Sequence, residues 1–559
     1  MNVAEAIARA LVAEGIRFAA GLAGTHVGHM LKAIADQEKI DVMYARQERA
    51  AFDMADGFAR ASGKPAVVFS DSGPAAVNTM GGLVNSWGDS TPVLFLAGHT
   101  NVNLTSFRDT KEIPFLEVFK PVSKWAALVT HPEQLSEILR RTFMALRSGR
   151  PGPVVLGLPH DVQAMEVGDF VYEPLGSNAQ LRSAADPDRV REAVHMIADA
   201  QNPYFYIGAG VLFSEASGEA VELAEIFTLP AATTLNGKSA FPEDHELSLG
   251  LGGYIRGRYH TYPAAKIAEE ADLIIAVGCG FKFEATRRKP CSSVKLIQID
   301  IDPAEINRGQ RADIALQGDA RLVLRQMIDC AKQVIGPEIL RPVKARLDRI
   351  QALKKEWETL CAPITQSQEM PMNPFRVTRE LCSLIDPSKT IMLHDAGTVR
   401  GTVCYHYPAI RPRSFLGFGA QSSMGWSLGA AFGASKAHPD KLVIAVIGEE
   451  AFHETAMDIE TSVRNNAPAL ILVKNNRKKV DMSSPNDRRL DYIRFHSGID
   501  ICAFARAMGA EAIRIERPDE LKSKLCEAIA HVKAGRTTVV EAVTRRAPPT
   551  LDSLWAKKP

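Results

Sequence analysis

Several features are scarce or missing in this chain of 559 residues, and each absence excludes a class of protein. The formal net charge is only +1, so the chain has no excess of basic residues that would attract nucleic acid or an anionic membrane. Its eight cysteines are scattered without a CxxC pair, which indicates a reducing compartment rather than a disulfide framework. We therefore expect no nucleic-acid partner.

Long apolar runs are also missing. No stretch is long enough to span a bilayer, and the first residues mix Ala, Glu and Arg at helical spacing instead of forming the apolar core of a signal peptide. We therefore expect a cytoplasmic protein without membrane association. The content of 46% hydrophobic and 23% charged residues is typical of globular proteins, and the length suggests about three domains.

One pattern is repeated in three blocks of the chain: a short apolar strand, a loop rich in Gly, Ser or Asn, and an amphipathic helix. The pattern predicts an α/β fold with three doubly wound parallel-sheet domains, because alternating strands and helices build parallel sheets covered by helices. The predicted domains are residues 1–167, 188–335 and 370–545, with a polar linker at 168–187 and a charged helical connection near 340–360. The predicted strands are 65–70, 92–98, 203–210, 272–280, 295–302, 390–397, 441–448, 469–476 and 537–543.

The most specific motif lies in residues 45–98. Glu48 opens a predicted helix at about 48–61, and a second predicted helix at 74–87 begins with Pro74 and contains Asn78. This segment resembles the pyrimidine-binding domain of the thiamine-diphosphate (ThDP) enzyme superfamily. In that family a glutamate opens a helix reading E-x-A-A-x-x-M-A-x-G-Y-A-R, which is followed by SGPG-x-x-N and D-S-x-P. A match over about fifty residues is far more specific than any short pattern.

The resemblance implies that Glu48 is both catalytic and cofactor-binding. ThDP must lose the proton on its thiazolium C2, which its own 4′-amino group removes when the ring nitrogen N1′ carries a proton. A carboxyl group in a dry pocket can share that proton. The alternative is a surface glutamate favoured by the helix dipole. The same resemblance places Pro74 and Asn78 at the cofactor.

Two further catalytic candidates come from shorter similarities. Residues 18–31 resemble the family's FGxPG strand and loop, and His26 occupies the place of an active-site histidine in benzaldehyde-lyase-like members. A histidine there can polarise a carbonyl or relay a proton, whereas the alternative is a loop histidine satisfied by the backbone. Arg108 replaces the glutamine of the family's AFQE segment, which hints at an anionic substrate or product.

Residues 419–441 resemble the diphosphate-binding domain of the same superfamily. By that resemblance Met424 is the hydrophobic wedge that bends ThDP, and the carbonyl of Ser422 accepts a hydrogen bond from its 4′-imino group. A bent cofactor makes proton removal an intramolecular step. The alternative is that Met424 only fills the core.

The metal-binding motif departs from the family pattern. The family's GDG and NN are replaced by Gly448-Glu449-Glu450 and Asn475-Asn476, with the spacing retained. By resemblance the magnesium ligands are the side chains of Glu449 and Asn476 and the backbone carbonyl of Lys478. Mg²⁺ demands octahedral oxygen ligands at about 2.0–2.1 Å, so the extra methylene of Glu449 requires the backbone to shift. The resemblance also implies that the diphosphate of the cofactor contacts Gly448, Glu449, Glu450, Ala451 and Asn476.

Two carboxylates facing the diphosphate repel it unless they are neutralised. Arg477, Lys478 and Lys479 follow Asn476 directly, so these cations either pair with the carboxylates or hold the diphosphate in place of the metal. We therefore question whether Mg²⁺ is retained. The alternative is that the lysines are solvated and that Glu449 and Asn476 hold a displaced ion.

The middle block contains IGAG at 207–210 and is similar to the central domain of the superfamily, which binds FAD in acetolactate synthases, ADP in some relatives and nothing in others. The GxRF of flavin-binding relatives appears as residues 278–281, without the arginine. We therefore expect an empty structural domain and no FAD.

The resemblance covers about residues 1–545 and implies a ThDP-dependent lyase or carboligase acting on C–C bonds next to a carbonyl, by 2-oxo acid decarboxylation or by acyloin cleavage or formation. The expected substrate is a small carbonyl compound or acyloin. An acetolactate synthase-type transferase ranks second, because Arg108, the missing flavin arginine and the absence of a tryptophan-bearing loop after Asn476 weigh against it. A cofactor-poor, non-catalytic paralogue with a binding or assembly role is a third hypothesis. The family places its cofactor between subunits, which implies a homodimer or homotetramer.

Overall fold

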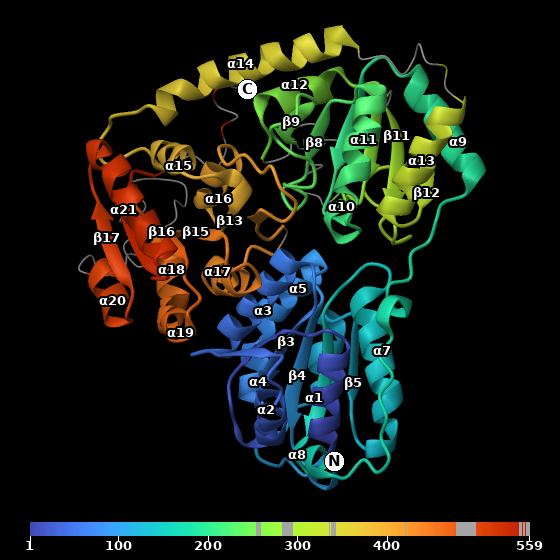
Figure 1. The fold of residues 1–559 in the computed structure, drawn as a ribbon, viewed down its shortest axis with the longest axis vertical. Coiled ribbons are helices and arrows are strands. Elements are labelled where there is room, and N and C mark those ends of the chain that lie inside the picture. Colours follow the sequence, from blue (N-terminus) through green and yellow to red (C-terminus); the bar gives the residue numbers. More distant parts are fainter. Residues whose placement is uncertain are drawn as a thin grey trace.

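The computed structural model describes residues 1–252, 259–281, 294–334, 336, 343–419, 421–476, 499–546, 551 and 554. These residues form three parallel sheets of six strands each, with helices interleaved between the strands (Figure 1). The structure therefore confirms the predicted α/β fold with three doubly wound parallel sheets.

The first sheet has the strand order β2-β1-β3-β4-β6-β5. Its strands are β1 (Phe18–Gly21), β2 (Asp41–Tyr44), β3 (Ala66–Ser70), β4 (Val93–His99), β5 (Trp125–Leu128) and β6 (Val154–Pro159). Its helices are α1 (Val3–Ala13), α2 (Gly28–Ala35), α3 (Glu48–Ser62), α4 (Pro74–Asn78), α5 (Met80–Asp89), α6 (Phe115–Phe119), α7 (Leu135–Arg147) and α8 (His160–Ala164). The helix predicted at 74–87 is divided at Thr79, whose hydroxyl donates to the Ala76 carbonyl at 2.7 Å.

The central sheet has the order β12-β11-β10-β7-β8-β9. Its strands are β7 (Pro203–Ile207), β8 (Ala231–Thr233), β9 (Ser248–Leu251), β10 (Leu273–Val277), β11 (Lys295–Asp300) and β12 (Ile314–Gln317). Its helices are α9 (Pro187–Asp199), α10 (Gly210–Phe213), α11 (Ser217–Phe227), α12 (Tyr262–Glu270) and α13 (Ala320–Val334). The predicted helical connection is the long helix α14 (Lys344–Thr365), which runs past α12 toward the third sheet (Figure 1).

The third sheet has the order β14-β13-β15-β16-β18-β17. Its strands are β13 (Thr390–His394), β14 (Phe415–Leu416), β15 (Leu442–Gly448), β16 (Leu470–Asn475), β17 (Glu511–Ile515) and β18 (Thr538–Val543). Its helices are α15 (Pro374–Ser383), α16 (Thr398–Cys404), α17 (Trp426–Ala437), α18 (Glu449–Thr455), α19 (Ile459–Arg464), α20 (Ile501–Ala507) and α21 (Leu521–Lys533).

The first and third sheets share one hydrophobic core through the packing of α3 against α17 (Figure 1). Glycines allow the two helices to approach closely. A Cβ atom at Gly57 of α3 would overlap the Ala430 carbonyl, and a Cβ at Gly433 of α17 would overlap the Met54 carbonyl. Interiors are packed densely, so a side chain at either glycine forces the helices apart. This contact joins α3, whose first residue is Glu48, to the third domain.

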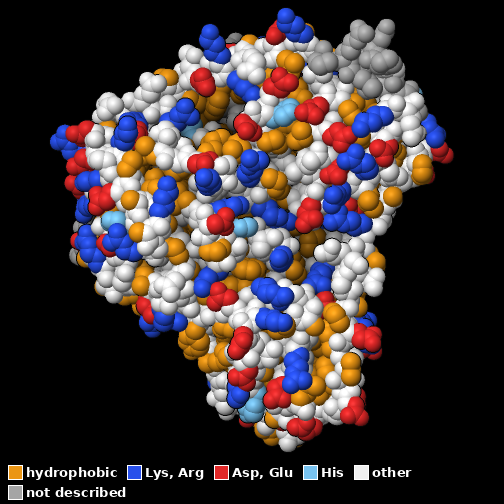
Figure 2. All heavy atoms as spheres, in the orientation of Figure 1, with side chains coloured by type: hydrophobic (Ala, Val, Ile, Leu, Met, Phe, Trp, Pro, Cys, Tyr) orange, Lys and Arg blue, Asp and Glu red, His pale blue; other side chains and the backbone are white. Residues whose placement is uncertain are grey.

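Charged side chains of both signs are interspersed on the face drawn in Figure 2. This distribution agrees with the formal net charge of +1. None of the helices in the described part of the chain combines the length and apolar character needed to cross a bilayer.

Candidate active site

Glu48 and Asn78 meet at the carboxyl edge of the first sheet. Glu48 is the first residue of α3, which follows β2, and Asn78 ends α4, which follows β3. The Asn78 amide donates from Nδ2 to Glu48 Oε2 at 3.2 Å. Pro74 begins α4 after Gly73, whose φ of +59° is in the left-handed region. Glu48 is partly buried while Pro74 and Asn78 are exposed, so the open side of this edge is accessible to a ligand.

His26 lies at the same edge, after β1, and is held by a carboxylate that the sequence analysis did not single out. The backbone N–H of His26 donates to Asp71 Oδ1 at 2.8 Å, and its ring Nδ1 lies 3.3 Å from the same oxygen. Gln163 Nε2 donates to the His26 carbonyl at 2.6 Å. These contacts fix the backbone on both sides of the His26 ring.

Lys111 pairs with the other oxygen of Asp71. Burial alone would raise the pKa of Asp71, but hydrogen bonds from Lys111 and from the backbone of Ser72 and His26 hold it below its ordinary value. Asp71 is therefore a charged group at neutral pH. It joins the loops that follow β1, β3 and β4.

Arg108 is exposed and adopts a left-handed conformation with a φ of +56°. Its neighbour Asp109 turns inward, accepting a hydrogen bond from the Thr100 hydroxyl and donating its backbone N–H to Glu112 Oε2 at 3.1 Å. The cation of this loop that contacts the carboxylate beside His26 is thus Lys111 rather than Arg108.

The Met424 loop, which we define as residues 421–425, precedes α17. Ser422 has a φ of +53°, and its hydroxyl accepts a hydrogen bond from Arg400 Nη2 at 2.7 Å. Met424 is partly buried against the core shared by the first and third sheets. Arg49 donates from Nη2 to the Met424 carbonyl and, at 2.8 Å, to the Ser423 hydroxyl. The loop is therefore held from α16 and from α3.

A third anchor of this loop is Asp395, which follows β13 and is fully buried. Its Oδ1 accepts from the Gly425 N–H at 2.9 Å and its Oδ2 from the Ser427 N–H at 2.8 Å. Burial raises the pKa of Asp395, while these backbone hydrogen bonds oppose the rise. Asp395 is a functional residue that no motif identified, although an acidic residue directly after a buried strand is a signal for a functional edge.

The altered metal motif lies at the carboxyl ends of β15 and β16. Gly448 ends β15, Glu449 begins α18, and Asn476 follows β16, which pairs with β15. Burial raises the pKa of Glu449 to about 7, while hydrogen bonds from its own backbone N–H and that of Asn476 oppose the rise. Glu449 and Asn476 are therefore neighbours.

Glu450 follows in the first turn of α18, and Ala451 is buried. A metal requires its carboxylate ligand to be deprotonated, so a cation at Glu449 must overcome the protonation that burial favours. The third predicted ligand, Lys478, and its neighbours Arg477 and Lys479 lie outside the described residues.

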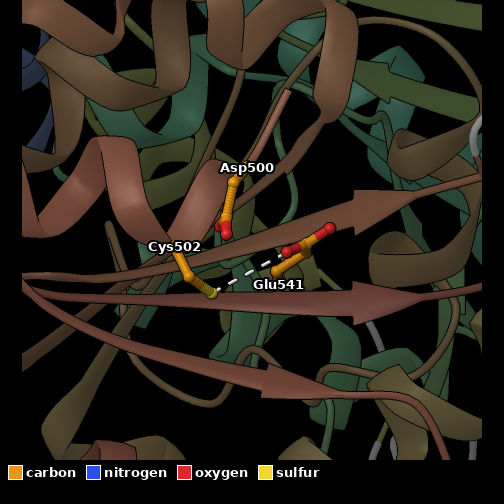
Figure 3. Close-up of side chains that lie close together, drawn as sticks. All are labelled: Asp500, Cys502 and Glu541. Atoms are coloured by element: carbon orange, nitrogen blue, oxygen red, sulfur yellow. Dashed lines mark hydrogen bonds between the residues drawn. The ribbon is translucent and has the colours of Figure 1, made fainter. Parts of the chain in front are cut away.

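A second group of metal-ligating side chains is formed by Asp500, Cys502 and Glu541, whose ligand atoms lie within 4.8 Å of one another (Figure 3). Burial raises the pKa of Cys502 to about 11, so without a metal the sulfur is a thiol at neutral pH. Glu541 accepts from Asn475 Nδ2 at 2.7 Å, and Asp500 accepts from the Ala503 N–H at 2.9 Å. We interpret this group as structural, because it links β16 and β18 to α20.

A cavity of about 530 Å³ lies between the three domains. Its volume is within the range of about 300–1,000 Å³ that is usual for ligand pockets. Neither Glu48 nor Met424 is among its lining residues, which include Arg60, Arg150, Asn236, Cys279, Arg400 and Arg413. Cys279 belongs to the segment that lacks the flavin-binding arginine. The cavity is therefore separate from the edge at which Glu48 lies.

Comparisons with known proteins match all three parts of the chain to one family. Residues 1–118 match "Thiamine pyrophosphate enzyme, N-terminal TPP binding domain". Residues 190–327 match the central domain of the same family, and residues 395–542 match its C-terminal TPP binding domain.

Relatives from three groups of organisms are similar over most of their length. A probable acetolactate synthase large subunit of Methanocaldococcus jannaschii is 35% identical over 546 residues, which cover 95% of this chain and 90% of the relative. Acetolactate synthase isozyme 3 large subunit of Escherichia coli is 29% identical, covering 97% and 94%. The mitochondrial acetolactate synthase catalytic subunit of Saccharomyces cerevisiae is 29% identical, covering 91% and 76%.

Proposed function

Because the chain belongs to the thiamine pyrophosphate enzyme family, on its acetolactate synthase branch, we propose that it is a ThDP-dependent carboligase acting on 2-oxo acids. The observation that carries the proposal is the similarity to acetolactate synthases over 95% of the chain. The contact between Glu48 and Asn78 at the ligand edge supports it. The comparisons favour the acetolactate synthase-type reaction, which ranked second on the sequence alone, over decarboxylation or acyloin cleavage.

In this proposal, bound ThDP supplies carbanion chemistry at its thiazolium C2. Glu48 holds a proton for the ring nitrogen N1′, and Asn78 orients its carboxylate by donating to Oε2. Met424 would support the cofactor from below the bend that the family resemblance implies, and the Ser422 carbonyl would accept a hydrogen bond from its amino group. The three anchors Arg49, Arg400 and Asp395 support this role, because they hold the Met424 loop before any ligand arrives.

His26 is the candidate for moving a proton at the reacting carbonyl. Its backbone is held by Asp71 and Gln163, and its ring Nδ1 lies 3.3 Å from Asp71 Oδ1 without a hydrogen bond to any described residue. A ring that is held in place but not saturated suits a proton relay. Arg108, which is exposed in the neighbouring loop, is the candidate for contacting a substrate carboxylate.

We propose that the protein still binds Mg²⁺, but only weakly. Glu449 and Asn476 lie together and fit two of the three ligands, and the Lys478 carbonyl would be the third. The buried and readily protonated Glu449 supports a lower affinity for Mg²⁺ than an aspartate would give. Glu450 adds negative charge in the same turn, which Lys478 and its basic neighbours would compensate.

We further propose a cytoplasmic homodimer or homotetramer with active sites between subunits. The exposed apolar side chains Val77 and Trp87, at 40% and 44%, lie on α4 and α5 and support such an interface. Two of the relatives are named large subunits, so a second type of subunit is a further candidate partner.

The test is to supply ThDP, Mg²⁺ and a panel of 2-oxo acids and to identify products by NMR. A branched 2-hydroxy-3-oxo acid is the expected product. Aldehyde and CO₂ without a new C–C bond would favour the decarboxylase. Bound ThDP without any turnover would favour the non-catalytic paralogue, the candidate that Glu449 and Glu450 support.

A further inference from the structure

Arg49, the residue after Glu48, makes more contacts than the two that anchor the Met424 loop. Besides its bonds to the Met424 carbonyl and the Ser423 hydroxyl, its Nη1 lies 3.6 Å from Glu454 Oε2. Its side chain is only 17% exposed. A guanidinium has a rigid set of donors that can engage two acceptors at once, whereas a lysine ammonium cannot reproduce that geometry. Arg49 therefore bridges α3, the Met424 loop and α18.

Asp53 lies one turn along α3 from Arg49 and is fully buried. Its Oδ2 is 3.4 Å from Arg49 Nε, and neither of its oxygens accepts a hydrogen bond from the described residues. Burial raises the pKa of Asp53 to about 8, and Arg49 opposes the rise. A buried carboxyl group is costly unless it has a partner, so this contact ties the guanidinium of Arg49 to α3.

The packing around Arg49 and Asp53 fixes where the guanidinium lies relative to the Met424 loop. Asp53 lies against Gly429 of α17, and the stem of Arg49 passes over Gly81 of α5. Helices α3 and α17 are in close contact at Gly57 and Gly433. The guanidinium thus projects from a rigid helix pair toward the loop that immediately precedes α17.

We propose that Arg49 is a positioning residue that holds the Met424 loop against the N-terminus of α3, with Asp53 orienting its guanidinium. The proposal deepens the proposed function, on which it rests only for the role of Met424. Arg49 is not a catalytic residue, since it contacts the loop and not the reacting atoms. Its removal frees the loop while leaving Glu48 and Asn78 in contact.

The first experiment measures hydrogen exchange in residues 421–427 of the full chain without cofactor. Arg49→Met keeps the aliphatic stem and removes the donors. We expect exchange in this segment to become about tenfold faster, the factor that corresponds to about 1.4 kcal/mol. The matched control is Arg46→Met, which removes a surface ion pair with Glu460; among the described residues the hydrogen bonds of Arg46 go to Asp458 and Glu460 and not to the loop.

Arg49→Lys is expected to restore part of the protection. If Arg49→Met lowers the melting temperature, Arg49→Met with Asp53→Asn removes both members of the pair and is measured in its place. Unchanged exchange in 421–427 would overturn the proposal, as would an equal increase in the Arg46→Met control.

The second experiment separates positioning from a purely structural role. Arg49→Met is expected to lower turnover at saturating ThDP by about tenfold. ThDP affinity is expected to change much less. Equal losses in both would contradict the proposal. Absence of turnover in the unaltered protein would count against the proposed function, and the exchange experiment would still decide the role of Arg49.

Discussion

The two ends of the candidate site are built in different ways. Around Glu48 and Met424, helices from two domains pack through glycines, and three charged side chains that are buried or partly buried anchor the Met424 loop. Around Glu449 and Asn476, the site consists of two adjacent strand ends with a buried, protonation-prone carboxyl group. Cofactor activation depends on geometry that packing must maintain. Holding the diphosphate depends on net charge, which several arrangements of acidic and basic residues can supply.

Of the changes in the region around Glu48 and Met424, Glu48→Gln is expected to lower activity most. It removes the proton partner of N1′ without changing the volume of the side chain, so we expect a loss of about 10²–10⁴-fold in C–C chemistry with the fold intact. Turnover and melting temperature are measured together, with the exposed Glu38→Gln as the control. A variant that keeps most of its turnover would show that Glu48 has been assigned wrongly.

Met424→Ala tests the shape of the cofactor rather than its protonation. We expect turnover to fall on the order of 10- to 100-fold, because small misplacements of reacting groups are costly, while ThDP affinity falls less. Met457→Ala, at a side chain that is 51% exposed, serves as the control. Equal losses of turnover and affinity would count against the wedge.

Sequence patterns predicted several of the strands that are buried on both faces, although they missed β6 and β8, which are also buried throughout. The runs at 390–397, 441–448 and 469–476 became β13, β15 and β16 because buried parallel strands are continuous apolar runs. They did not predict β5, which is only partly buried, or β14, which has two residues and no measurable period.

In the candidate site, too, sequence motifs predict some features and miss others. Glu48 and Met424 stand out through motif resemblance, whereas Arg49 and Met424 lie 375 residues apart and only the fold brings them into contact. Asp71 and Lys111, 40 residues apart, are a second such pair. No local spacing encodes these contacts, because each depends on how two loops meet at a sheet edge.

Chelation of Mg²⁺ tests the region around Glu449 and Asn476. We expect ThDP affinity to change by less than about tenfold, or about 1.4 kcal/mol, between saturating Mg²⁺ and excess EDTA. Restoring Glu449→Asp together with Glu450→Gly is expected to raise the dependence on Mg²⁺. A larger loss in the unaltered protein would show that the metal still bridges protein and diphosphate, and would exclude compensation by the basic residues.

The smallest expected effect concerns the central cavity. Its segment 278–281 lacks the flavin-binding arginine, so we expect the purified protein to show no flavin absorbance. Added FAD is expected to leave the melting temperature and turnover unchanged. A bound flavin, or a rise in melting temperature with FAD, would show that other cavity residues such as Arg400 replace the missing contact.

The central claim is that the region around Glu48 and Met424 can activate the cofactor although the metal motif at Glu449 and Glu450 has changed. Hydrogen exchange at the thiazolium C2 of ThDP, followed by NMR with saturating cofactor, tests this most directly. The account predicts that the protein accelerates this exchange relative to free ThDP, that EDTA leaves the acceleration in place, and that Glu48→Gln removes it. Exchange at the rate of free ThDP, despite saturated binding, would contradict the account.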